Sequence, residues 1–539
     1  MTDKTATSPA VRVRIAPSPT GAVHLGLVRT ALYNWLFARH NGGKFILRID
    51  DTDQQRNSDD VLKPLFEGLR WLGIDWDEGP FVGGPHEPYF QSQRTASHRA
   101  AVERLLERGA AYRDYATPEE INAERRHVID SKQGVFRYSR RWMAETAELR
   151  SRFEAEGRKG VVRLKMPTEG TLVLDDIVRG RVEFDWALEQ DHVIQRADGT
   201  PLYHLASVVD DFEMGITHVI RAEEHLSNTP RQVFIVQSLG YEVPKYAHLP
   251  FVAEPGSKNK LSKRKIKAYL KNRDFAELVE RGNRIARAIG LDVNPDFFNP
   301  VVTEFYERIG FLPEALINYI VLLGWSLDDR TEEFSRNELI RIFSLERVTR
   351  APASFDPTKL MAFQVKQMQA LSAAERARLC LPFLQKAGAV GPEPAADVLR
   401  RIESIVVAAG DRIKVAGDIL DYTGFFVADE RLPFDEADLA KAFGKPEAAT
   451  LLGRFLPRLA AAESFEATAL EQLVGEFVAA EGIKLGQLIQ PLRVALTGKA
   501  VGFGLYETMV ILGPASVVRR VEFALARTAS GGAGAKGKE

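Results

Sequence analysis

The stretch "VRIAPSPTGAVHLGLVRTALYNWLFARH", Val13–His40, joins two apolar segments through a loop with prolines, glycines and one histidine. Before the loop, residues 11–16 alternate apolar and basic side chains, which is typical of a strand. After it, apolar residues recur at the spacing of a helix that packs one face: Leu25, Val28, Leu32 and Leu36. "GGKFILRID", residues 42–50, predicts a second strand. The region therefore predicts a β-α-β unit of a parallel sheet.

The loop has two interpretations. A tight turn alone accounts for its prolines and glycines. A helix that begins near His24, however, presents free backbone N–H groups and a positive dipole end, which together bind anions. Gly21 and Gly26 would let a phosphate approach the backbone, and His24 would donate a hydrogen bond to it. The loop by itself leaves both interpretations open.

Length, charge and cysteine content restrict the class of protein. A chain of 539 residues is too long for one core and predicts several domains. Its net charge of −1 means that any site for a polyanion must come from local clustering. The single cysteine, Cys380, excludes an internal disulfide and a cysteine-based zinc site, and we expect it in a core. The N-terminal segment resembles no secretory signal and no apolar run reaches membrane-spanning length, so we expect a cytoplasmic protein without membrane contact.

The rest of the chain has three regions of different character. A mostly helical stretch is predicted for residues 61–106. Short strands separated by glycine, "GVVRLKMP", "GTLVLDDIV" and "GRVEF", predict an inserted antiparallel module between residues 111 and 190. Amphipathic helices are predicted from about Glu332 onward, and the end of the chain, "ASGGAGAKGKE", predicts a disordered tail.

A second motif, "KLSKR" (Lys260–Arg264), lies in a stretch from Ser257 to Arg273 that is rich in Lys and Arg and has no acidic residue. Taken alone, such a stretch is typical of a solvated basic loop. The alternative is a mobile loop whose ammonium groups stabilise the charge that develops on a polyphosphate.

Together, "PSPTGAVHLG" (Pro17–Gly26) and "KLSKR" resemble the two signature motifs of class I aminoacyl-tRNA synthetases. More narrowly, "RIAPSPTG", "RTALYNWLFAR", "LRIDDTD", "VVDDFEMGITHVIRAEEHLSNTPRQ", "LPEALINYIVLLGWS" and "FSLERV" resemble the bacterial glutamyl-tRNA synthetase family. The resemblance is dense from Val11 to about Pro357. It implies an α/β Rossmann-type catalytic domain with an α+β insertion that grips the tRNA acceptor end, followed by an all-α anticodon-binding region.

The resemblance also implies a division of the chain. The expected parts are a catalytic domain in two halves (1–110 and 191–256), an acceptor-stem module (111–190), the KLSKR loop with an insertion and a stem-contact region (257–345), a helical anticodon-binding region (346–528) and a disordered tail (529–539). The implied reaction has two steps. Glutamate attacks the α-phosphate of ATP to give glutamyl-adenylate, and the 3′ end of tRNA(Glu) then accepts the glutamyl group. In this family the first step characteristically needs bound tRNA.

The resemblance implies roles for ten residues, and general chemistry agrees with them. The catalytic and ATP-binding residues would be His24, Gly26, Lys260, Ser262 and Lys263. The glutamate-binding residues would be Arg14, Ser18, Asp50, Tyr203 and Arg221. Guanidinium groups bind carboxylates bidentately, and a carboxylate is suited to the α-amino group. Mg²⁺ would arrive with ATP, and no zinc is expected.

The chain departs from the family pattern in several places. Asp50 stands where Glu is usual, and Ser207 stands where Asn is common, which makes Ser207 a weak candidate. Leu27 replaces a histidine of the first motif at a position that varies in this branch. A segment from Lys265 to Gly310 intervenes where the family usually continues directly, and the sequence gives it no role. The cysteines of a zinc knuckle near "AYRDYATPEE" are missing.

Three alternatives stay open at this level. The enzyme could also charge tRNA(Gln), because the anticodon contacts lie beyond residue 350, where the resemblance is weakest. A glutaminyl-tRNA synthetase shares the motifs, but it would need β-barrels in the C-terminal half. An inactive RNA-binding paralogue would be expected to have lost His24 or Lys263, and both are present. By analogy we expect a monomer.

Overall fold

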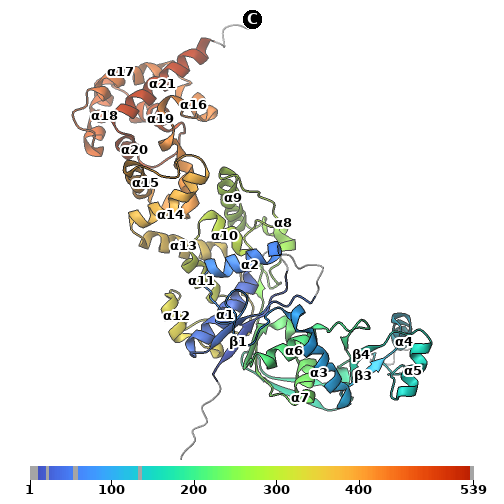
Figure 1. Ribbon diagram of the computed structural model, residues 1–539. Coiled ribbons are helices and arrows are strands. Elements are labelled where there is room, and N and C mark those ends of the chain that lie inside the picture. The colour runs from blue at the N-terminus through green and yellow to red at the C-terminus, as the bar shows by residue number, and fades with distance from the viewer. Residues whose placement is uncertain (1–9, 20–22, 53–58, 131–135, 534–539) are drawn as a thin grey trace, which may run out of the picture. The chain divides into compact units, whose positions relative to one another are not determined.

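The β-α-β prediction for the N-terminal stretch is confirmed in the computed structural model, which describes residues 10–19, 23–52, 59–130 and 136–533 (Figure 1). Strand β1 (Arg12–Ile15) pairs in parallel with β2 (Lys44–Leu47), and helix α1 (Leu25–His40) connects them and packs against both. The apolar stripe of α1 is completely buried at Leu25, Val28 and Leu32. The prediction of a single packed face is too narrow, because residues outside the stripe, such as Tyr33 and Asn34, are buried as well.

A second parallel pair repeats this arrangement later in the chain. Strands β8 (His218–Ala222) and β9 (Lys245–Leu249) are joined by η4 (Glu223–Asn228) and α7 (Thr229–Leu239), and α6 (Tyr203–Glu213) precedes them. Thr217 N donates to Arg12 O at 2.9 Å, so β8 starts beside β1. The two parallel pairs make the Rossmann-type core that the family resemblance implies.

The inserted module has the predicted antiparallel strands. β3 (Ala111–Asp114), β4 (Val161–Leu164) and β7 (Val193–Gln195) form one antiparallel sheet, and β5 (Thr171–Asp176) and β6 (Gly180–Asp185) form a hairpin. Helices α4 (Pro118–Asp130) and α5 (Ala147–Ala155) belong to the same segment. The hairpin packs against β9, so it reaches the Rossmann core.

The predicted helical stretch 61–106 is only partly helical. The structure has α2 (Asp59–Trp71), η2 (Gln91–Arg94) and α3 (Thr95–Glu107). Residues 72–90 form turns and loops instead, since "GIDWDEGPFVGGPHEP" is interrupted by glycines and prolines. The loop is fixed to the core by Leu47 N, which donates to Glu78 O at 2.9 Å.

The segment Lys265–Gly310, which the sequence left without a role, contributes residues to both compact units of the chain. Its elements are η5 (Lys263–Lys265), α8 (Ile266–Tyr269), α9 (Arg273–Ala288) and α10 (Thr303–Ile309). Leu25 N donates to Val301 O and Thr303 N donates to Val23 O, both at 2.9 Å. The segment therefore pairs with the backbone at the start of α1, beside His24.

The chain divides into two compact units. The first comprises Met1–Ala276, Pro295–Glu307 and Pro313–Leu360, and the second comprises Glu277–Asn294, Arg308–Leu312 and Met361–Glu539. The remaining elements of the first unit are β10 (Val252–Ala253), α11 (Pro313–Val321), α12 (Arg336–Ile342), η6 (Leu345–Arg347) and β11 (Ala353–Ser354). Helix α13 (Pro357–Ala370) begins in the first unit and continues into the second.

All regular elements of the second unit are helices in its described residues. Its helices after α13 are α14 (Ala373–Lys386), α15 (Ala396–Ala409), η7 (Gly410–Arg412), η8 (Ala416–Phe426), η9 (Asp429–Arg431), α16 (Glu436–Phe443), α17 (Pro446–Ala460), α18 (Ala467–Glu481), α19 (Leu485–Thr497), α20 (Leu505–Leu512) and α21 (Pro514–Ala533). Cys380 is completely buried, as predicted. Within this unit, Arg281 and Arg284 of α9 form ion pairs with Asp418 of η8 at 2.5 and 2.8 Å.

The predicted tail at residues 529–539 needs correction. Helix α21 continues to Ala533, so its last residues are helical despite their small side chains. Residues 534–539 lie outside the described part of the chain. No helix in the described residues is both long and apolar enough to span a bilayer.

Candidate functional site

A cavity of about 460 Å³ lies at the carboxyl ends of the parallel strands of the first unit. Ligands of open α/β sheets bind at this edge. All ten residues singled out from the sequence line it: Arg14, Ser18, His24, Gly26, Asp50, Tyr203, Arg221, Lys260, Ser262 and Lys263. Ser207 lines it too. The structure thus brings together residues that are up to 249 positions apart in the chain (14 to 263).

His24 is the N-cap of α1, and its ring has a defined orientation. Its Nδ1 accepts a hydrogen bond from Leu27 N at 3.1 Å, so Nε2 carries the proton of the neutral ring. Desolvation in the cavity, followed by the positive charges of Lys260 and Lys263, lowers the pKa of His24 to about 4. At neutral pH the ring is therefore an uncharged N–H donor beside the α1 N-terminus, which suits a phosphate oxygen.

The His24 ring also explains why position 26 is a glycine. A Cβ atom at position 26 would lie 3.2 Å from His24 Nδ1, closer than an ordinary van der Waals contact. The glycine therefore leaves the histidine room to cap the helix. Thr20, Gly21 and Ala22 of the motif, and Asp53 of "DDTD", lie outside the described residues.

The two lysines of the KLSKR loop differ in their surroundings. Lys260 Nζ forms an ion pair with Glu224 Oε1 at 2.7 Å, whereas Lys263 has no ion pair with any described residue. Ser262 caps η5 through its side chain, and its backbone N–H donates to Tyr269 Oη at 3.0 Å. The loop is thus fixed at Ser262 and Lys260, while Lys263 remains available to a ligand in the cavity.

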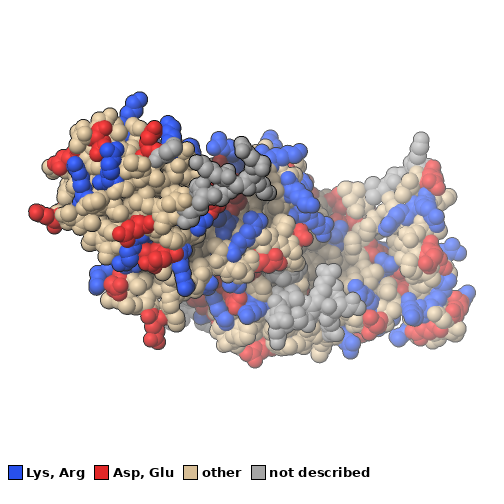
Figure 2. All heavy atoms as spheres, turned by 90° about the horizontal axis from the view of Figure 1, so that it is seen from above, with Lys and Arg blue, Asp and Glu red and all other residues tan. Residues whose placement is uncertain are grey.

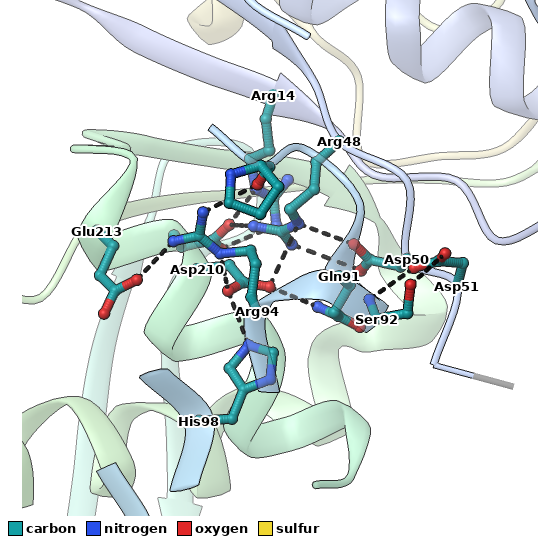
Figure 3. Close-up of polar contacts among 12 residues, drawn as sticks. Arg14, Arg48, Asp50, Asp51, Gln91, Ser92, Arg94, His98, Asp210 and Glu213 are labelled. Atoms are coloured by element: carbon teal, nitrogen blue, oxygen red, sulfur yellow. Dashed lines mark hydrogen bonds and ion pairs between the residues drawn. The ribbon is translucent and has the colours of Figure 1, made fainter. Parts of the chain in front are cut away.

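One wall of the cavity is a network of paired charges (Figure 3). Arg14 Nε and Nη2 donate to Asp211 at 3.0 and 3.2 Å. Arg48, completely buried, donates through Nη1 to Asp211 Oδ1 at 2.6 Å and through Nε to Asp50 Oδ1 at 2.8 Å. Arg48 therefore links two carboxylates. One is Asp50, which is expected to bind an amino group, and the other is Asp211, which holds Arg14.

The same network continues behind the wall through Asp210, next to Asp211 on α6. Its carboxylate accepts hydrogen bonds from Arg94 Nε at 2.6 Å, His98 Nε2 at 2.8 Å and Gln91 Nε2 at 2.8 Å. Burial opposes ionisation of Asp211, but Arg14 and Arg48 outweigh it and lower its pKa. For Asp50, burial prevails over Arg48 and raises the pKa. Asp50 is therefore the member of the network that an ammonium group would stabilise most.

The opposite wall holds Arg221 without a carboxylate. Nε donates to His248 Nε2 at 3.0 Å and Nη1 donates to Gln232 Oε1 at 2.6 Å. Nη2 donates to Thr229 Oγ1 at 3.0 Å and to His225 O at 3.2 Å. These acceptors are neutral, and no described carboxylate lies within ion-pair distance of Arg221. One N–H of Nη1 remains of the five that a guanidinium carries.

This difference makes Arg221 a candidate anion site in the cavity. The residue is 6% exposed, and burial lowers its pKa. A buried cation without a counter-ion is costly, and an anionic ligand in the cavity removes that cost. Tyr203 is nearby, with its hydroxyl 3.4 Å from His225 Nδ1.

Sequence reasoning missed Arg48, Asp211, Glu224 and His225, which complete the site. The signal for the first two was present, because a charged residue inside an apolar run such as "FILRID" or "ASVVDDF" is buried only with a partner. The identity of the partner was not readable, because the pairs join distant segments. Glu224 and His225 follow directly after β8 and line the cavity.

No cluster of His, Cys, Asp and Glu suited to a metal ion occurs among the described residues. On the face seen in Figure 2, Lys and Arg are interspersed with Asp and Glu, in line with the net charge of −1. The described surface therefore has mixed charge on this face.

Comparison with known proteins places the chain among proteins of known activity. Residues 10–285 and 299–362 match the model of the family described as tRNA synthetases class I (E and Q), catalytic domain, and residues 375–525 match an anticodon binding domain. A glutamate–tRNA ligase of Moorella thermoacetica is 40% identical over 95% of this chain and 97% of its own. Glutamate–tRNA ligase 2 of Rubrobacter xylanophilus is 41% identical over 96% and 98%. The crystal structure of a glutamate tRNA ligase from Elizabethkingia meningosepticum, in complex with its amino acid, has a TM-score of 0.78 at 32% identity and covers 96% of this chain and 99% of its own.

Proposed function

Since this chain belongs to the class I tRNA synthetases of the glutamate and glutamine branch, we propose that it is a glutamate–tRNA ligase that uses the cavity of the first unit. The observation that carries the choice of amino acid is Arg221, a buried guanidinium held only by neutral acceptors. A glutamate carboxylate supplies the missing counter-ion, whereas the neutral amide of glutamine does not. The helical second unit agrees, because a glutaminyl enzyme would need β-barrels there, and no strand follows Ser354 in the described residues.

In the first step the α-carboxylate of glutamate attacks the α-phosphate of ATP, a P–O bond forms, and pyrophosphate leaves. Arg221 binds the side-chain carboxylate of glutamate, and Asp50 receives its α-amino group. Arg14, Ser18 and Tyr203 complete the amino-acid site. This chemistry depends on position and on charge stabilisation, so a rigid network behind Asp50 is an advantage.

The phosphates of ATP fit the other half of the cavity. His24 Nε2 and the backbone N–H of Gly26 at the start of α1 donate to phosphate oxygens, since Leu25 N and Leu27 N are already bonded to Val301 O and His24 Nδ1. The ammonium group of Lys263 neutralises charge on the departing pyrophosphate. Lys260 and Ser262 hold the loop that carries Lys263. Mg²⁺ enters as part of the ATP substrate.

In the second step a hydroxyl of the terminal adenosine of tRNA(Glu) attacks the activated carbonyl and releases AMP. We propose that the inserted module, residues 111–190, holds the acceptor end and that the second unit holds the anticodon. We further propose that the enzyme works in the cytoplasm as a monomer. Sedimentation of the pure protein with and without tRNA tests the oligomeric state.

The decisive experiment is aminoacylation of purified tRNA(Glu) and tRNA(Gln) with labelled glutamate, ATP and Mg²⁺. Charging of tRNA(Glu) with glutamate supports the proposed ligase, and charging of neither tRNA overturns it. Charging of both defines an enzyme with relaxed tRNA choice. A parallel reaction with labelled glutamine is the control for the amino acid, and it should give no product.

A further inference from the structure

Arg221 is held from behind by a residue pair that the reaction itself does not require. His248 on β9 accepts from Arg221 Nε through its Nε2, at 3.0 Å. The other ring nitrogen, Nδ1, lies 2.6 Å from Asp176 Oδ2. Asp176 is the last residue of β5, in the hairpin of the inserted module. The three side chains form a buried chain from the hairpin to the cavity, and the whole residues Asp176, His248 and Arg221 are 3%, 0% and 6% exposed.

Charge determines which atoms donate and which accept along this series of three side chains. A carboxylate only accepts, so Asp176 receives the N–H of His248 Nδ1. The neutral ring then has a bare Nε2, which is the atom that Arg221 Nε needs as an acceptor. If the proton moved to Nε2, two donors would face each other at 3.0 Å. The orientation of Arg221 therefore depends on the tautomer that Asp176 selects.

Asp176 is itself held rigidly at the tip of the hairpin. Its Oδ1 accepts from Val178 N at 3.0 Å and Arg179 N at 2.8 Å, which caps the turn between β5 and β6. Ile177 N donates to Tyr246 O on β9 at 2.9 Å, so the tip is attached to the strand that carries His248. The carboxylate therefore cannot rotate away from the ring without opening the turn.

The contacts of the Arg221 Nη atoms come from a different element than the contact of Nε. Gln232 and Thr229 hold the Nη atoms from α7, whereas His248 alone holds Nε among the described residues. Removal of the Nε contact would let the guanidinium plane turn about its Nη contacts. The one Nη1 N–H without an acceptor among the described residues, which is proposed to serve the ligand, would then lose its direction.

We propose that Asp176 and His248 are positioning residues that fix the guanidinium plane of Arg221 for the side-chain carboxylate of glutamate. Through Asp176, the inserted module contributes to amino-acid recognition in addition to packing against β9. This inference rests on the proposed function, in which Arg221 binds that carboxylate.

The isosteric substitution Asp176→Asn tests the tautomer directly. It places an N–H₂ group opposite His248 Nδ1, which favours the tautomer with the proton on Nε2. We expect the KM for glutamate in aminoacylation to rise about 10-fold, the effect of one misdirected hydrogen bond, while kcat and the KM for ATP change less than about 3-fold. Asp175→Asn is the matched control, because Asp175 is the preceding residue on the exposed face of the same strand, and it should match the wild type.

Two substitutions of His248 keep the proposal testable if Asp176→Asn does not fold. His248→Gln retains an acceptor at the place of Nε2 and should keep the glutamate KM within about 3-fold of the wild type, whereas His248→Asn is too short to reach Arg221 and should raise it about 10-fold. A purely structural role predicts that both lower the melting temperature with equal effects on KM. Equal KM values for the two variants would overturn the proposal.

A double-mutant cycle with Arg221→Lys separates this inference from the proposed function. If Asp176 acts through Arg221, the glutamate KM of Arg221→Lys is high and Asp176→Asn adds nothing to it. A wild-type KM in Arg221→Lys would contradict the proposed role of Arg221 itself. A high KM in Arg221→Lys together with a wild-type KM in folded Asp176→Asn would overturn only the positioning role.

Discussion

The two walls of the cavity hold their arginines in opposite ways. On one wall Arg14 and Arg48 are neutralised by Asp211 and Asp50 at 2.6–3.2 Å. On the other wall Arg221 has only neutral acceptors. Paired charges satisfy one another and make a rigid wall, whereas an unpaired buried cation requires an anion from outside. The first wall is therefore internally neutralised, whereas the second offers an unpaired positive charge to an anionic ligand.

The largest effect is expected from Arg221→Ala. Removal of one partner from a desolvated charge pair should lower kcat/KM for glutamate on the order of 1,000-fold. The KM for ATP should stay within a few fold of the wild type, because the phosphates are proposed to bind beside His24 and Lys263 and not at Arg221. Steady-state aminoacylation of tRNA(Glu) measures both. Wild-type use of glutamate would mean that the unpaired cation has a different ligand.

For stability, the larger effect is expected at the paired arginine, Arg48, and the smaller effect at Arg221. Arg48→Met leaves Asp50 and Asp211 without their shared cation and should lower the free energy of unfolding by about 3–5 kcal/mol. Arg221→Met removes an uncompensated charge but also leaves its acceptors unpaired. These effects oppose each other, so a change within about 2 kcal/mol is expected. Urea unfolding of both variants, followed by a probe in the first unit, measures the difference. An equal loss in the two variants would refute the contrast between the walls.

These residues also mark the limit of sequence reasoning. The strand and helix periods around "APSPTGAVHLG" are local, so they predict β1, α1 and the loop between them. The KLSKR motif predicts a phosphate site when it is taken with the first motif. The partners of Arg48 and Arg221 are not local, because Asp211 and His248 lie on other elements. A buried charge can be recognised in the sequence, but its partner depends on tertiary structure.

Other differences between the predictions from sequence and the structure also arise from tertiary contacts. The segment Lys265–Gly310 gave no signal for its role, because it pairs with Val23 and Leu25 through backbone groups that every sequence possesses. Small residues at 529–533 predict disorder, yet they extend α21. Asp50 lines the cavity and its role toward the amino group stays a prediction, whereas its link to Arg48 became visible only in the folded chain.

The two lysines of the KLSKR loop also differ in pairing, because Lys260 has a counter-ion and Lys263 has none among the described residues. We expect a smaller loss of activity from their substitution than from that of Arg221. Lys263→Ala should lower kcat on the order of 100-fold with little change in the glutamate KM, the scale for one lost electrostatic donor. Lys260→Ala should cost about 10-fold, since Glu224 already neutralises part of its charge. Single-turnover formation of the adenylate with tRNA present measures both. A greater loss in Lys260→Ala would reverse the assignment of the two ammonium groups.

The smallest effect concerns pH and depends on whether the charge of Arg221 is unpaired. Burial, followed by Arg221, lowers the pKa of His225 from 6.5 to about 4. As pH falls from 6.5 toward 4, the unfolded chain takes up a proton there that the folded chain refuses, so this residue makes the protein less stable across that window. Arg221→Met should raise the pKa of His225 and make the loss shallower. Arg14→Met should change it less, because Asp211 already neutralises Arg14. NMR titration of His225 in the two variants measures the difference, and an equal shift in both would mean that the two arginines project the same field into the cavity.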